Sequence, residues 1–299
     1  MSIHPEHRTK DENMIQITVC PGKPKNLISF LKPVVEEVQA MYDNKLVIKK
    51  EGIELFRGRV AIAGVTGDIP GISELMMTAG HTATFGCRIC KCPKMGPLRT
   101  LEELKNGDAT HGMPGVPKLY TDLKTFINPY FFFGDELHML GHGMGHMAYK
   151  LLDPRTDDWF QAADVDHYPF QVSSPFRQKE FSKMLGDWIV ASKSICPTAF
   201  NYSFDKRTGY YRAVDWQDFL LYVIPTIIVP NLRYRRAKVA LMNLVNAVSI
   251  SLQKSITSTD LDDMDRFLQA WATFMNNEIT FRRLNHRVWT MNNHFATFH

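Results

Sequence analysis

Three cysteines stand close together in the chain, at Cys87, Cys90 and Cys92. A Cys-x2-Cys pair lets two thiolates bind one Zn²⁺ ion from a single tight turn, and a tetrahedral site needs two further ligands. Cys92, His81 and His111 are the nearest candidates for those two positions. The spacing predicts a zinc knuckle that contains His81, Cys87, Cys90 and Cys92. The alternative is a loop of reduced thiols without a metal.

Asp68 follows a long apolar run, residues 54–67, which predicts a buried strand. Ile69-Pro70 comes next and opens a short helix expected over residues 73–78. Open α/β sheets place ligand and metal groups at the carboxyl ends of their strands, so Asp68 is a candidate catalytic carboxylate. An aspartate that only caps the helix is the equally weighted alternative.

A third candidate site is a series of ionisable side chains at steps of three and four residues: Asp135, His138, His142 and His146. This spacing places them on one helical face, where they could share an ion or a proton. We favour a functional role for Asp135 and His138, and a packed position for His146. The glycines between the histidines each cost a helix about 1 kcal/mol, so they predict a close approach by another backbone.

A cluster of cations could contact nucleic-acid phosphates: Arg233, Arg235, Arg236 and Lys238. Residues 231–256 contain five basic and no acidic side chains, and Tyr234 could add a stacking surface. The alternative is a solvated helix face, which is the commoner reason for a run of charge.

These candidates need elements to position them, and the periodicity predicts a mainly helical second half. Its helices are expected over residues 135–152, 178–194, 216–229, 235–252 and 260–284, the last capped by Thr259. The first half predicts a helix over residues 24–43, strands at 46–48 and 54–67 joined by a hairpin at Gly52, and an irregular segment over residues 80–117 that carries the knuckle. We therefore expect an α-rich α/β fold with domains at residues 1–134 and 135–299.

Composition narrows the class of protein further. The 299 residues are 44% hydrophobic and 22% charged, which is globular and excludes disordered, collagen-like and coiled-coil proteins. A net charge of +4 excludes a histone-like polycation. Residues 1–13 are polar, unlike a secretory signal, and the apolar run of residues 219–230 is shorter than the roughly 18 residues that span a bilayer. No membrane association is expected, and the five cysteines favour a reducing compartment.

Several segments in the same order resemble the transposases of CACTA-type (En/Spm-like) elements, in the variant found in fungal elements. The resemblance runs from about Val19 to His299. It is carried by CPGKPKNLISFLKPVVEEV, RVAIAGVTGDIPGISELMMTAGHTATFGCRICK, DELHMLGHGMGHMAYKLL, RAVDWQDFLLYVIPTIIVP and WTMNNHFATFH.

The resemblance implies an RNase-H-like core in which carboxylates hold two Mg²⁺ ions for DNA strand cleavage and joining. Asp68 then looks like the second carboxylate of the Asp-Asp-Glu set. Asp135-x2-His138 looks like the Cys/Asp-x2-His signature, and Cys87-x2-Cys90 like the zinc-binding insertion. DNA is the implied partner, the nucleus the implied location, and homo-oligomers are possible in such a family.

The family's first aspartate and final glutamate have no match in this sequence, so the RNase-H-like core is expected to be incomplete and whether the chain is an enzyme stays open. We expect a transposase-derived protein. One alternative is a domesticated, non-catalytic module that binds DNA or a protein. A weaker alternative is a metal-dependent hydrolase that uses Asp135, His138 and His142.

Overall fold

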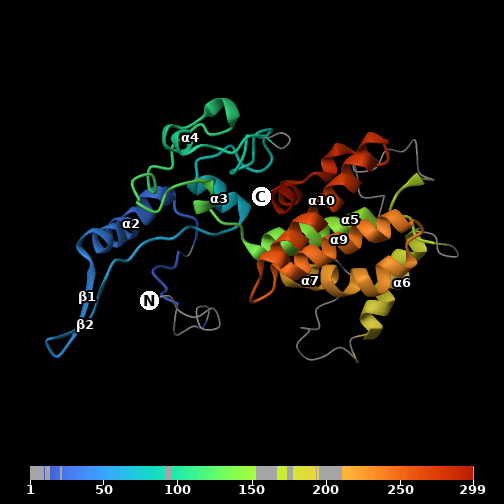
Figure 1. The fold of residues 1–299 in the computed structure, drawn as a ribbon, viewed down its shortest axis with the longest axis horizontal. Coiled ribbons are helices and arrows are strands. Elements are labelled where there is room, and N and C mark those ends of the chain that lie inside the picture. The colour runs from blue at the N-terminus through green and yellow to red at the C-terminus, as the bar shows by residue number, and fades with distance from the viewer. Residues whose placement is uncertain are drawn as a thin grey trace. The chain divides into compact units, whose positions relative to one another are not determined.

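The computed structural model describes residues 10, 14–20, 22–91, 96–152, 167–173, 178–192, 194 and 211–298 (Figure 1). It divides into two compact units, Met1–Asp135 and Glu136–His299. Each unit has a hydrophobic core of its own. The helix-rich α/β class expected from the sequence is confirmed, with one two-stranded sheet in the described part of the chain.

The first unit opens with helix α2 (Leu27–Asn44), whose first turn is capped by the side chain of Asn26. Strands β1 (Leu46–Lys50) and β2 (Ile53–Gly58) follow as the expected antiparallel hairpin, with Gly52 in the turn at φ 81°. The second strand is shorter than residues 54–67, because the chain leaves the hairpin after Gly58.

Short elements complete this unit: α3 (Ile69–Leu75), α4 (Leu101–Asn106), η2 (Ala109–His111) and η3 (Pro129–Phe131). Its core is built on aromatic rings packed edge to face. Phe131 and Phe132 meet at 5.4 Å between ring centroids, and both contact Tyr120 and Phe126. Such edge contacts fix the loop that precedes Asp135.

The second unit is mainly helical where it is described, with one isolated antiparallel bridge between Val172 and Leu232. Its elements are η4 (Leu137–Gly145), α5 (His146–Leu152), α6 (Gln178–Ser192), α7 (Ala213–Asp218), η8 (Phe219–Ile228), α8 (Val229–Asn231), α9 (Arg235–Ser251), α10 (Ser258–Thr280), η9 (His286–Val288) and α11 (Met291–Phe298). Every helix expected in this half is present. One detail was wrong: α10 starts with a capping box made by Thr257 and Asp260, so Thr259 is not its N-cap.

Helix η4 is a π-helix, and its glycines explain how it packs. A Cβ added at Gly141 would lie 2.0 Å from the carbonyl oxygen of Ala213, and one at Gly145 would lie 2.2 Å from that of Trp216. The backbone of α7 therefore rests directly on η4, and the close approach predicted from the glycines is confirmed. Side chains at these positions would hold the two helices apart.

One continuous helical stretch, Ala213–Asn231, is long and apolar enough to cross a membrane by length and composition, which is weak evidence on its own. Within the unit, Leu220, Ile224 and Ile228 of this stretch are fully buried in the core. Burial of this kind is typical of a core helix.

Candidate functional site

Two segments of the first unit run parallel to each other and each ends in an aspartate. The N–H of Val65 donates to the carbonyl of Phe131, and the N–H of Phe133 donates to the carbonyl of Val65, both at 2.8 Å. Val65 and Phe132 form the bridged pair. Asp68 lies three residues after Val65, and Asp135 lies three residues after Phe132. Because parallel segments point the same way, this pairing brings both aspartates to the same end of the pair.

Asp68 caps helix α3. Its Oδ1 accepts a hydrogen bond from the N–H of Gly71 at 2.7 Å, and the side chain is exposed. The structure therefore shows Asp68 as the N-cap of α3. A carboxylate has a second oxygen, so capping by Oδ1 is compatible with metal binding through Oδ2.

The pair Cys87 and Cys90 forms a tight turn around one sulfur. The Sγ of Cys87 accepts N–H bonds from Ile89 and from Cys90, each at 3.3 Å, and the two Sγ atoms lie within 4.8 Å of each other. Backbone N–H groups aimed at a sulfur favour its thiolate form, which is the form that binds a metal. These two residues could hold a metal ion and are compatible with a zinc site.

Two of the other candidate ligands, His81 and His111, are not brought to this pair. His81 is exposed, and neither His81 nor His111 lies within 4.8 Å of both thiols. Cys92 lies outside the described residues.

Arg99 is a buried residue that the sequence reasoning missed. Its guanidinium donates to the carbonyl of Cys87 at 2.8 and 3.0 Å and to that of His111 at 2.7 Å. Arg99 thereby connects the Cys87 turn to the loop of residues 108–113. In that loop, the Nδ1 of His111 is hydrogen-bonded to the Oδ2 of Asp108 at 2.7 Å. Only the nearness of Arg99 in the sequence to the cysteine cluster, seven positions after Cys92, could have drawn attention to it.

Arg88, between Cys87 and Cys90 in the sequence, is a second buried guanidinium at this turn. Burial lowers the pKa of Arg88, and the neighbouring charge of Cys87 opposes that shift. A cation beside Cys87 favours the thiolate, as the N–H bonds do.

In the second unit, two histidines of the predicted series lie together and one lies apart. The rings of His138 and His142 are exposed and stacked, with centroids 5.9 Å apart and planes 28° apart. His146 instead stacks on Trp216 at 4.6 Å, as the packed alternative predicts. Burial, followed by the charges of Lys150 and His142, lowers the pKa of His146 from 6.5 to about 4. Asp135 closes the first unit, ahead of this helix.

Three of the four predicted DNA-binding cations have a polar contact within the unit. Arg236 forms an ion pair with Glu278 at 3.0 Å, Lys238 donates to the carbonyl of Pro230 at 3.0 Å, and Arg233 donates to the side-chain oxygen of Gln171 at 3.2 Å. The side chains of Arg233, Arg235 and Arg236 are all exposed. The guanidinium groups of Arg233 and Arg236 lie 5.3 and 4.8 Å from the centroid of the Tyr234 ring, so cations occupy the stacking surface that was expected there.

Glu278 is a buried carboxylate, at 2% exposed, and it forms ion pairs with two arginines. Besides Arg236, Arg283 reaches it at 3.2 Å between Nη1 and Oε2. Nothing in the local sequence distinguishes Glu278 from a surface glutamate, because Arg236, one of its two partners, lies 42 positions earlier in the chain, in α9.

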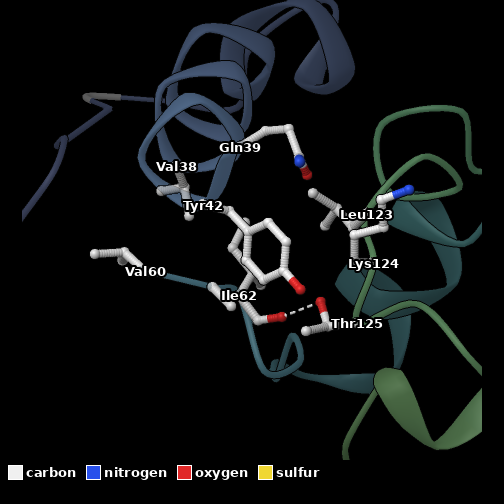
Figure 2. A pocket seen from close by; sticks show the side chains of 9 residues that line it. Val38, Gln39, Tyr42, Val60, Ile62, Leu123, Lys124 and Thr125 are labelled. Carbon is white, nitrogen blue, oxygen red and sulfur yellow. Dashed lines mark hydrogen bonds between the residues drawn. The ribbon is translucent and has the colours of Figure 1, made fainter. Parts of the chain in front are cut away.

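A small cavity in the first unit lies between α2 and the segments at residues 60–62 and 123–125 (Figure 2). Tyr42 and Leu123 line it, and the hydroxyl of Thr125 donates to the carbonyl of Ile62 at 2.5 Å beside it. Its empty volume is about 180 Å³, part of which is open to solvent.

Comparison of the chain with protein-family models, with curated proteins and with solved structures gave no match. The class that the fold and site define is a two-unit, helix-rich protein with a pair of carboxylates at the end of a parallel pair and a Cys-x2-Cys turn.

Proposed function

We propose that this is a transposase-derived protein whose first unit retains the central part of an RNase-H-like core. Asp68 and Asp135 bind a divalent ion of the Mg²⁺ class there. The observation that carries this proposal is the parallel pairing of residues 65 and 132, which sends both aspartates to one end. Carboxylate oxygens are the ligands that Mg²⁺ and Mn²⁺ prefer.

The proposed site is incomplete as a catalyst. Strand cleavage and joining by two metal ions requires enough carboxylates to hold both ions. Asp68 and Asp135 supply only two carboxylates, which we assign to a single ion. The protein binds DNA in the nucleus in this proposal, with little or no cleavage of its own.

Mn²⁺ titration followed by electron paramagnetic resonance tests the carboxylate site. We expect one weakly bound ion, and we expect Asp68→Asn to reduce its affinity by about tenfold or more, because asparagine removes the negative charge. Asparagine caps a helix as well as aspartate does, so α3 stays capped and the variant isolates metal binding. Asp135→Asn should have the same effect.

Asp122→Asn, an exposed carboxylate of the same unit, is the matched control and should change nothing. Ion binding that survives both Asp68→Asn and Asp135→Asn would contradict the metal site. A plasmid-nicking activity that Asp68→Asn abolishes would show instead that the enzyme is complete.

We also propose that the Cys87–Cys90 turn is half of a structural zinc site. Purified protein should then contain one zinc ion per chain by elemental analysis, and Cys87→Ser should remove it because serine offers no thiolate. Cys20→Ser is the control, since Cys20 is exposed and lies well outside the turn. Zinc retained by the Cys87→Ser variant would place the ion elsewhere.

The exposed arginines favour DNA contact by the second unit. Charge reversal of Arg233 and Arg235 together should weaken DNA binding. The slope of the logarithm of the binding constant against the logarithm of the salt concentration should become less negative by about 0.9 for each phosphate contact that is lost. A gel-shift series from low to moderate salt measures this slope. Lys254→Glu, outside the cluster, is the control. If the double charge reversal leaves the salt-dependence slope unchanged, the basic cluster is a solvated helix face and not a DNA contact.

A further inference from the structure

His138 and His142 lie outside the carboxylate pair and the cysteine turn, and they have the arrangement of a chelating pair. Both side chains are exposed on η4, one helical turn apart. Their rings face each other with centroids 5.9 Å apart. Two imidazoles in this position can direct one nitrogen each at a common ion after small rotations about their side-chain bonds.

We propose that His138 and His142 form a binding site for a divalent transition-metal ion of the Zn²⁺ or Cu²⁺ class. Imidazole nitrogens suit these ions, whereas Mg²⁺ and Ca²⁺ prefer oxygen ligands. The two histidines fill two coordination positions of the ion. The remaining positions open toward solvent, where water or an added ligand completes the coordination.

The helix that carries the pair is held rigidly, which lowers the cost of bringing the two rings together. Gly141 and Gly145 rest against the backbone of α7, and Gly143 packs against Asn292 of α11. These contacts with α7 and α11 fix the backbone of η4, and therefore the positions from which the two histidine side chains extend. Preorganised ligands lose little conformational entropy when the metal binds.

His146 continues the histidine series but is not part of the site. Its ring is stacked on Trp216, away from the exposed pair. Two histidines thus make the site, and the third keeps the helix packed.

Titration of the full-length, metal-free protein with Cu²⁺ nitrilotriacetate tests the site, because this complex leaves two neighbouring coordination positions for imidazoles. Electron paramagnetic resonance should show one equivalent bound with two nitrogen ligands from the protein. His138→Ala and His142→Ala should each lower the affinity by about tenfold or more, since either change leaves a single ligand without chelation.

His286→Ala, which removes an exposed histidine of the same unit, is the matched control and should change the affinity by less than about twofold. Asp68→Asn and Cys87→Ser should leave the spectrum unchanged, which separates this site from the two proposed above. In a second measurement, Zn²⁺ should raise the unfolding midpoint of the unaltered protein more than that of His142→Ala. Binding that survives both histidine variants, or that depends on only one of them, would overturn the proposal.

Discussion

Replacing Arg236 and Arg283 together with alanine should lower the free energy of unfolding of the second unit by about 3–5 kcal/mol. The side chain of Glu278 is 3% exposed and has both arginines within ion-pair distance. Without them, a carboxylate stays buried with its two cations gone, and the cost of its desolvation is no longer offset. Urea denaturation followed by circular dichroism measures the change.

Adding Glu278→Gln to that double variant should recover part of the lost stability, because it removes the buried charge. Arg266→Ala is the matched control. Arg266 pairs with Asp263 at the surface, where both side chains are well exposed, so its loss should cost less than about 1 kcal/mol. A double variant that unfolds within about 1 kcal/mol of the unaltered protein would contradict the role of this network.

Acid should destabilise the second unit through His146. The pKa of this group is about 4 in the folded protein against 6.5 for an exposed histidine. The unfolded chain therefore takes up the proton first as the pH falls. The stability that His146 contributes is complete above pH 6.5 and is lost between about 6.5 and 4, by at most about 3 kcal/mol.

Urea denaturation at a series of pH values in metal-free buffer measures this loss, and the NMR titration of the His146 ring gives its pKa directly. His146→Phe, which keeps a ring on Trp216 but does not titrate, should flatten the stability profile between pH 6.5 and 4. His286→Gln should leave the profile unchanged. An equally steep profile in His146→Phe would assign the acid sensitivity to other groups.

Local patterns were sufficient to predict the helices. The apolar stripe of α10 and the acidic residues at its start placed that helix within a few residues of its observed bounds. The glycines at 141, 143 and 145 predicted close packing because each is unfavourable in a helix unless it serves a contact. Helix bounds and packing glycines depend on residues close together in the chain, so the periodicity of the sequence is enough to predict them.

The long-range pairings could not be predicted in this way. The apolar run of residues 54–67 suggested one long strand, whereas the chain uses its first part in a hairpin and its last part beside residue 132. The same limit applies to Arg99 and Glu278, since burial and partners from distant elements decide their roles. For the candidate site, the residue types were visible in the sequence, but which of them meet was not.

The pairing of residues 65 and 132 also bears on how the first unit folds. The hydroxyl of Thr66 donates to the carbonyl of Gly134, and these residues are 68 positions apart in the chain. Closing so long a loop costs more entropy than closing the β1–β2 hairpin, so contacts of this range form late and slow the folding of the unit. The end that carries Asp68 and Asp135 is therefore assembled after the hairpin. During synthesis, Asp68 can therefore reach the same end as Asp135 only after the ribosome has made the whole first unit.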